Sequence, residues 1–200
     1  TPMIKIAFNT LKLLRPRQWI KNIAVFAAII FSGELFDWSS LQKALIAFFV
    51  FCILSSAIYI VNDIFDIKKD RLHPFKRFRP LAHQDLTIPY ALAVAVLLII
   101  ASLVTALMVT PAFFALTVVY LLIQLYYSTV LKAIPVVDIL AIASGYILRV
   151  YGGELAGGFH ISVWLLLTTI SLSLFLAVGK RRSELTLVSQ NKSVNIADIR

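Results

Sequence analysis

The feature that most constrains the fold is the long run from Leu86 to Leu131, which contains no charged side chain. A helix that crosses a bilayer needs about 20 mostly apolar residues, so this run is too long for one span. Pro111, preceded by the polar Thr110, marks the break between two spans. The whole chain is 60% hydrophobic and 14% charged, whereas soluble domains are roughly 45–50% apolar and about 25% charged. The sequence therefore predicts an all-α polytopic membrane bundle and excludes a disordered chain.

Six segments have the length and composition of membrane spans, and together they predict a single transmembrane domain over residues 1–200. The predicted spans are residues 19–36, 41–62, 88–109, 111–131, 135–155 and 161–179. Residues 63–86 and 180–200 are predicted to be cytoplasmic loops.

The distribution of Lys and Arg supports this count of spans and sets the orientation. These residues lie in the N-terminal lead and in every even-numbered junction, while the opposite junctions contain only Lys43. Cytoplasmic loops are the ones enriched in Lys and Arg. The pattern predicts a multi-pass protein of the plasma (inner) membrane with a cytoplasmic N-terminus. It also explains the net charge of +9 as a topology signal that binds anionic headgroups, so no nucleic-acid partner is expected.

An acidic cluster at the end of the second span predicts a metal site. Asn62, Asp66 and Asp70 are spaced i, i+4, i+8, and Asp63 precedes Asp66 by three residues, so all four fall on one side of a helix. Carboxylates this close repel each other, and a hard divalent cation relieves the repulsion. Oxygen ligands without His or Cys favour Mg²⁺, and we assign catalysis to Asp63 and Asp66. The alternative is that the acids only pair with the basic residues that follow: Lys68, Lys69 and Arg71.

The loop that follows the acidic cluster supplies cationic side chains for phosphate. Lys76, Arg77 and Arg79 lie between Pro74 and Pro80, and arginine suits bidentate contact with phosphate oxygens. Carboxylates for Mg²⁺ beside arginines for phosphate are what a bound diphosphate requires. The alternative for each basic residue is a topology signal alone.

Ionisable residues inside a span are costly and are functional by default. Asp138 and Arg149 both lie in the predicted fifth span, and Lys132 lies at the junction before it. We predict that all three bind substrate. Arg149 has the alternative of a buried pair with another helix or of snorkelling outward, and Lys132 the alternative of a lone topology signal.

The Asn-Asp-x-x-Asp-x-x-x-Asp run and the Lys-Arg-x-Arg-Pro loop resemble the first aspartate-rich motif of the UbiA-type intramembrane prenyltransferase superfamily. The resemblance continues in the helix 1 entry, residues 15–22, which includes Lys21, and in the segment from Tyr127 to Lys132. It implies a bundle of about nine helices with a Mg²⁺-diphosphate cavity open to lipid, and it adds Lys21 and Tyr127 to the substrate-binding residues. A chain with six spans is then expected to be truncated at its C-terminal end.

The end of the sixth span departs from the usual pattern of this superfamily. A second aspartate-rich motif is typical there, whereas this chain reads Gly-Lys-Arg-Arg-Ser-Glu-Leu over residues 179–185. That run is similar to one branch, the decaprenyl-phosphate phosphoribosyltransferases. The similarity implies transfer of 5-phosphoribose from phosphoribosyl diphosphate to a polyprenyl phosphate, with substrate contacts from Lys180, Arg181, Arg182 and Glu184.

Two other functions stay open at this stage. A prenyltransferase that moves a polyprenyl chain from its diphosphate to an aromatic acceptor would share the first motif, but the missing second acidic cluster disfavours it. A transporter would carry its ionisable groups near the membrane midplane, whereas here they gather at the predicted cytoplasmic ends. The sequence leaves the polyprenyl length and the oligomeric state open.

Overall fold

The structure, a computed structural model, describes residues 2–130 and 134–190, and all regular elements in these ranges are helices. In chain order they are α1 (Pro2–Leu14), the 3-10 helix η1 (Pro16–Phe26), α2 (Ala27–Ser32), α3 (Trp38–Leu72), the 3-10 helix η2 (Lys76–Phe78), α4 (Ile88–Val109), α5 (Pro111–Thr129), α6 (Pro135–Gly157) and α7 (Val163–Gln190). The predicted all-α class is confirmed.

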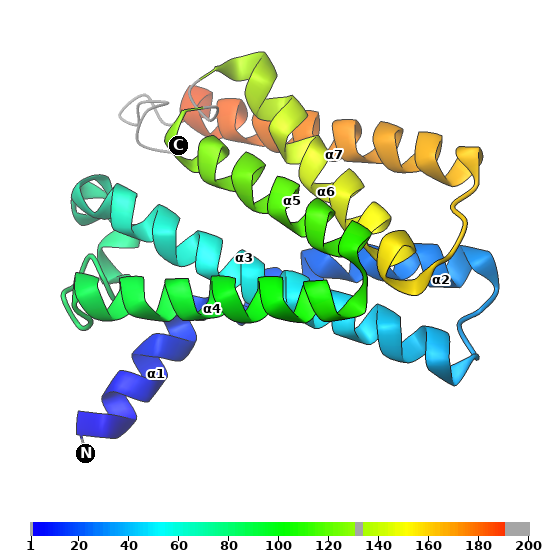
Figure 1. Cartoon of the computed structure of the whole chain (residues 1–200). Coiled ribbons are helices and arrows are strands. Elements are labelled where there is room, and N and C mark those ends of the chain that lie inside the picture. Colours follow the sequence, from blue (N-terminus) through cyan, green and yellow to red (C-terminus); the bar gives the residue numbers. More distant parts are fainter. Residues whose placement is uncertain (1, 131–133, 191–200) are drawn as a thin grey trace.

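Five helices are long and apolar enough to cross a membrane, namely α3, α4, α5, α6 and α7. They run side by side along one direction, whereas α1 projects at a steep angle from one end of the bundle (Figure 1). The first predicted span, residues 19–36, corresponds to η1 followed by α2, which together cover residues 16–32. That segment is not a single continuous α-helix, and its crossing of the bilayer stays a prediction.

Two segments predicted as loops are partly helical. Helix α3 continues through the acidic cluster to Leu72, and α7 continues through the basic run to Gln190. Hydropathy places the end of a span where charged residues begin, but a helix ends only where the backbone leaves the helical conformation. For α3 this point is His73, which precedes Pro74, because a residue before proline is driven out of the helical region.

Helix α3 forms the centre of the bundle. It packs against α1, η1, α2, α4, α5 and α6, and most of its apolar window is buried, whereas little of α4 or α7 is. The Phe51 ring meets Tyr120 and Phe113 of α5 edge-on, with ring centroids 5.1 and 5.9 Å apart. The central helix is thus fixed by aromatic packing, and its charged end is held at one end of the bundle.

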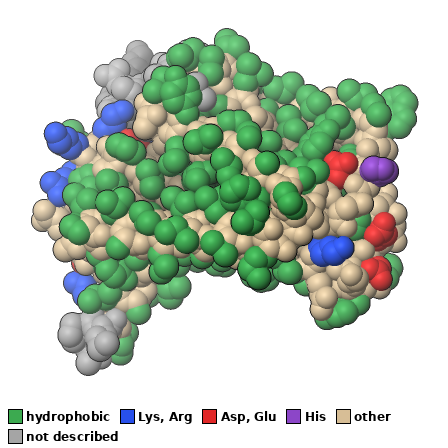
Figure 2. Space-filling model, in the orientation of Figure 1, with side chains coloured by type: hydrophobic (Ala, Val, Ile, Leu, Met, Phe, Trp, Pro, Cys, Tyr) green, Lys and Arg blue, Asp and Glu red, His purple; other side chains and the backbone are tan. Residues whose placement is uncertain are grey.

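Charge is segregated along the bundle. Lys and Arg side chains gather at the end where α3 ends and α4 begins, and hydrophobic side chains cover the middle (Figure 2). Several acidic side chains lie at the opposite end. The acidic cluster of α3 and the basic run of α7 therefore share the basic end of the molecule.

Gly153 of α6 sits where a neighbouring backbone leaves no room for a side chain. A Cβ at this position would lie 2.1 Å from the Val25 carbonyl oxygen of η1. We expect Gly153→Ala to lower the free energy of unfolding by about 1–3 kcal/mol, since overpacking of this kind forces the backbone to move. Denaturant unfolding in detergent micelles measures the change. Gly179→Ala is the matched control, because nothing lies within 4 Å of its Cβ position, and equal stability losses in both variants would contradict the prediction.

Candidate functional site

Two arginines hold two buried carboxylates of α3 at the basic end. The Asp63 Oδ1 atom accepts hydrogen bonds from Arg15 Nη2 at 2.5 Å and from Arg79 Nη1 at 3.1 Å. The same Arg79 Nη1 atom donates to Asp70 Oδ2 at 2.6 Å. The Asp63 and Asp70 side chains are only 3% and 5% exposed. One guanidinium nitrogen thus joins two carboxylates that are nearly removed from solvent.

The backbone positions these four side chains from three parts of the chain. Asp63 and Asp70 are two turns apart on α3, which places them on one face. Arg79 follows η2, and Arg15 precedes η1 with φ 53° and ψ 56°, the left-handed region that few non-glycine residues adopt. The Arg15 guanidinium also lies 5.3 Å from the centre of the Tyr59 ring. Strained residues of this kind cluster at functional sites, where the surrounding structure holds them.

The sequence patterns did not single out Arg15 as a site residue. The available signal was its place directly before Pro16 in the helix 1 entry. Its contact with Asp63 joins residues far apart in the chain, which no local spacing rule predicts.

The predicted convergence of three carboxylates and an amide differs from what the structure shows. Within residues 2–130 and 134–190, no three acidic, His or Cys side chains are placed to hold one metal ion together. Asn62 and Asp66 are half-buried on the same end of α3. Asp63 and Asp70 do pair with basic residues, but with Arg15 and Arg79 and not with their neighbours in sequence. Of those neighbours, Arg71 donates to the Ala82 carbonyl oxygen at 3.3 Å, and Lys68 and Lys69 are exposed.

Two other predicted phosphate ligands lie on η2. Lys76 is half-buried, and this burial lowers the pKa of its ammonium group, as does the charge of Arg79; Asp70 and Asp66 act in the opposite direction. Lys76 therefore belongs to the same electrostatic cluster as the acids. Arg77 is exposed, and its guanidinium lies 4.8 Å from the centre of the Phe78 ring.

A second cluster joins α5, α6 and α7. The fully buried Asp138 accepts a hydrogen bond from Tyr127 Oη at 2.9 Å and is bound by Arg181 Nε through its other oxygen. Tyr127, Asp138 and Arg181 were predicted separately, and the structure brings them together. Of the other predicted residues, Lys132 lies outside the described residues, and so does the side chain of Glu184.

Arg149 lies in the core of the bundle among neutral partners. It donates to Asn22 Oδ1, the Gly145 carbonyl oxygen and Tyr120 Oη, each at 2.7 Å. It is 6% exposed, so the alternative of outward snorkelling is wrong, and its contacts join η1, α5 and α6. Lys21, on η1, is exposed and lies within electrostatic range of Arg149 and Arg15.

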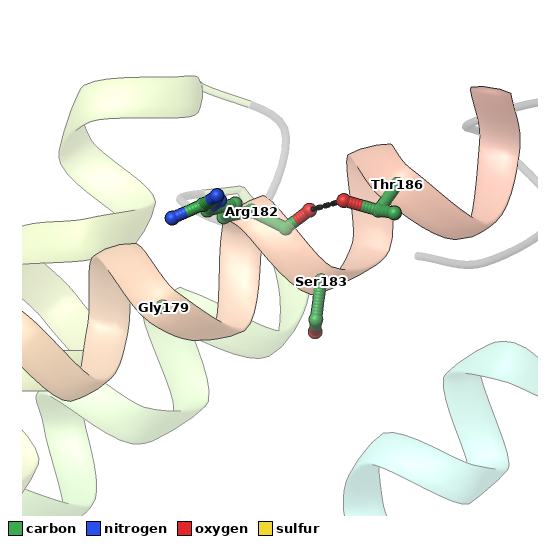
Figure 3. A pocket seen from close by; sticks show the side chains of 4 residues that line it. All are labelled: Gly179, Arg182, Ser183 and Thr186. Carbon is green, nitrogen blue, oxygen red and sulfur yellow. Dashed lines mark hydrogen bonds between the residues drawn. The ribbon is translucent and has the colours of Figure 1, made fainter.

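A pocket of about 430 Å³ lies beside the end of α7, lined by Gly179, Arg182, Ser183 and Thr186. Figure 3 shows these residues on successive turns of the helix, with the Thr186 hydroxyl donating to the Arg182 carbonyl oxygen at 2.9 Å. The Ser183 hydroxyl donates to the Lys180 carbonyl oxygen in the same way. Arg182 is the basic residue among those that line the pocket, whereas Lys180 is exposed and is not part of its lining.

The fold and these clusters define a multi-pass membrane protein. One end of its helices carries buried carboxylates paired with arginines, and a pocket lined in part by Arg182. The chain belongs to the UbiA prenyltransferase family, whose family model matches residues 22–180.

Comparisons with individual proteins agree with this assignment. The chain is 41% identical over 190 residues to a decaprenyl-phosphate phosphoribosyltransferase of Corynebacterium glutamicum, covering 93% of this chain and 57% of that protein. It is 40% identical over 193 residues to the enzyme of the same name from Mycobacterium tuberculosis, covering 94% and 64%. The chain thus spans about three fifths of the length of these relatives.

The fold also matches a solved structure. A UbiA homologue from Archaeoglobus fulgidus, solved with DMAPP and Mg²⁺ bound, superposes with a TM-score of 0.78 at 23% identity, covering 90% of this chain and 65% of that one. At this identity the likeness establishes the fold.

Proposed function

We propose that this chain carries the active site of a polyprenyl-phosphate phosphoribosyltransferase. The enzyme transfers 5-phosphoribose from phosphoribosyl diphosphate to a polyprenyl phosphate such as decaprenyl phosphate and releases diphosphate. The observation that carries the proposal is the 40–41% identity to decaprenyl-phosphate phosphoribosyltransferases over more than nine tenths of this chain. The basic run of α7, which stands where prenyltransferases of this superfamily typically have a second acidic motif, supports the same choice.

The first cluster fits a divalent cation. Asp63 and Asp70 already share one cationic nitrogen of Arg79, and Mg²⁺ is bound in proteins by one or two carboxylates together with phosphate oxygens and water. Asp63 and Asp70 would hold the ion, and the predicted contribution of Asn62 and Asp66, which lie on the same end of α3 but, in the part of the chain that the structure describes, form no three-carboxylate group with them, stays a prediction. When bound, Mg²⁺ neutralises charge on the departing diphosphate.

The arginines of this cluster bind and orient the diphosphate. Arg79 uses only Nη1 for Asp63 and Asp70, and Arg15 uses Nη2 for Asp63. A guanidinium has five N–H donors, so each arginine keeps donors for phosphate oxygens while the carboxylates fix its position. Lys76 adds a cation to the same cluster. Hydrogen-bond donors that are held in place before charge develops in the transition state supply a large share of the rate enhancement.

The transfer itself needs no strong base. The bond from ribose C1 to the diphosphate oxygen breaks, its electrons leave with diphosphate, and an oxygen of the polyprenyl phosphate forms the new bond to C1. That oxygen is already anionic, so no proton must be removed. The lipid tail stays in the bilayer, and the basic end of the bundle faces the cytoplasm at the inner membrane, since Lys and Arg gather on that side.

Analysis of lipid products tests this function. Membranes that contain the full-length protein are incubated with labelled phosphoribosyl diphosphate and a polyprenyl phosphate, and the lipid extract is examined by mass spectrometry. We expect a polyprenyl phosphate that has gained one 5-phosphoribosyl group. A product from labelled prenyl diphosphate and an aromatic acceptor, with none from phosphoribosyl diphosphate, would favour the prenyltransferase instead.

Arg182 is the residue of the basic run that we expect to bind a substrate phosphate in the pocket beside α7. We expect Arg182→Gln to raise the KM for the polyprenyl phosphate or for phosphoribosyl diphosphate about tenfold, the effect of losing one charge-assisted hydrogen bond. Lys180→Gln is the matched control, since it removes a nearby charge that does not line the pocket. Steady-state kinetics with each substrate varied in turn measures both, and equal effects of the two variants would contradict the assignment.

A further inference from the structure

Helix α1 carries an apolar face that no other part of the described chain covers. Ile4, Phe8 and Leu11 are spaced i, i+4, i+7, and their exposed fractions are 70, 56 and 57%. This spacing places them on one face of the helix. Three large apolar side chains exposed together on one short helix indicate a surface that something apolar covers.

The opposite side of α1 is fixed to the bundle. Leu13 is buried in an apolar cluster with Ile60, Leu81 and Leu86, and the Thr10 hydroxyl lies 3.1 Å from Tyr90 Oη of α4. The Lys5 ammonium lies 3.2 Å from Asp85 Oδ1, in the turn before α4. These contacts hold α1 in place, so its apolar face is directed by the fold and is not the result of a loose terminus.

Helix α1 is short and stands at an angle to the spanning helices. The helix has 13 residues, whereas a span needs about 20. It leaves the bundle at a steep angle to the spanning helices, at the end where Lys and Arg side chains gather (Figures 1 and 2). A helix that leaves the charged half of a bundle at a steep angle to the spans can run along the level of the lipid headgroups.

The charges beside the apolar face complement anionic headgroups. The Lys12 ammonium lies 4.6 Å from the centre of the Phe8 ring, at the border of that face, and the Lys5 side chain is 73% exposed. An apolar face flanked by lysines is typical of helices that lie in the membrane interface, with the apolar side chains among the acyl chains and the ammonium groups at the phosphates.

We propose that α1 is an interfacial anchor that binds the surface of the bilayer through Ile4, Phe8 and Leu11 and recognises anionic lipid headgroups through Lys5 and Lys12. The anchor holds the chain directly before Arg15 at the membrane surface. Arg15 reaches Asp63 from the residue that follows α1, so the lipid contact also steadies one arginine of the candidate site.

One spin label on α1 and a control label on the charged end of α3 test the proposal. Cys52 is the single cysteine and is buried, so a cysteine introduced at an exposed position is labelled selectively. The full chain with Leu11→Cys is reconstituted into phosphatidylcholine vesicles that contain phosphatidylglycerol. We expect the label to collide readily with oxygen, which enters the bilayer, and rarely with a water-soluble nickel complex. Lys69→Cys, an exposed position at the charged end of α3, is the matched control, and its label should show the reverse preference.

A second comparison separates the lipid charge from the apolar contact. In vesicles with phosphatidylglycerol, we expect Lys12→Gln to lower the ratio of membrane-inserted to water-exposed Leu11 label about fivefold. This is the effect of removing the attraction between one lysine and an anionic membrane surface. In phosphatidylcholine alone, the same substitution should change this ratio little. Equal access of the nickel complex to the Leu11 and Lys69 labels would overturn the proposal. Protection of the Leu11 label from both reagents, with dipolar broadening between labels, would overturn it in favour of a second copy of this chain.

Discussion

Replacing Asp63 by asparagine is expected to reduce phosphoribosyl transfer by about 10²–10³-fold, the range measured when one preorganised electrostatic group is removed from an active site. Asn keeps the size of the side chain but not its charge. Asp63 accepts from both Arg15 and Arg79, so the change weakens the cation site and the hold on both arginines, although Arg79 keeps its bond to Asp70. Initial rates with purified membranes, measured across a range of Mg²⁺ concentrations, give the loss.

Stability measurements distinguish a damaged site from a damaged fold in this variant. Breaking a buried ion pair on one side costs about 3–5 kcal/mol, and the Arg15 and Arg79 side chains are about one quarter exposed, so we expect a cost at or below the low end of that range. Thermal unfolding in detergent should also lose the stabilisation that Mg²⁺ with diphosphate gives the wild-type protein. Asp85→Asn is the matched control, since Asp85 pairs with Lys5 and His83 at the same end of the bundle but at the surface, where such pairs contribute about 0–1 kcal/mol. A folded Asp63→Asn protein with wild-type transfer would exclude Asp63 from the reaction.

The acidic cluster also illustrates how far sequence reasoning reaches. The i, i+4, i+8 spacing predicted a helical face beyond the apolar span, and α3 does continue to Leu72. The spacing could not identify the partners of the acids. Lys68, Lys69 and Arg71 are nearest in sequence, yet Arg15 and Arg79 make the contacts to Asp63 and Asp70. Partner choice depends on how η1 and the loop after η2 pack against α3, and no local pattern contains that information.

For the charged residues inside the spans, too, the sequence predicts the position but not the partners. The apolar surroundings of Asp138 and Arg149 in the sequence predicted functional side chains that bind substrate; both side chains are buried, and their contact with substrate stays a prediction. Their partners follow from packing alone. Asp138 meets an arginine of α7, whereas Arg149 meets an amide, a carbonyl and a hydroxyl. The two residues share a helix, but one is an ion pair and the other is a cation held by neutral groups, a difference that composition and spacing do not encode.

Replacing Asp138 by asparagine is the second change for which we expect a large effect, and we expect this effect mainly on the stability of the fold. Asp138 is fully buried and its Arg181 partner is 12% exposed, so the variant removes the negative charge of Asp138 from beside a nearly buried guanidinium. We expect a loss of about 3–5 kcal/mol in the free energy of unfolding. Because α7 packs mainly against α6, we also expect α7 to separate from α6 first, which hydrogen exchange of α7 amides would detect as faster exchange than in α3.

A double-mutant cycle tests whether the Asp138–Arg181 pair, and not Asp138 by itself, is responsible. Removing both charges of a buried ion pair often changes the free energy of unfolding little, even where removing one of them lowers it strongly. We therefore expect Asp138→Asn combined with Arg181→Gln to be more stable than Asp138→Asn alone, with a coupling energy of about 1–3 kcal/mol. Arg182→Gln in the Asp138→Asn background is the matched control, because Arg182 lines the pocket beside α7.

Additive effects of Asp138→Asn and Arg181→Gln would show that the ion pair does not hold α7 to α6. The basic run would then be positioned by other contacts. A measured coupling would mean that Asp138 fixes Arg181 as a positioning residue, so that the neighbouring Arg182 is presented to the pocket.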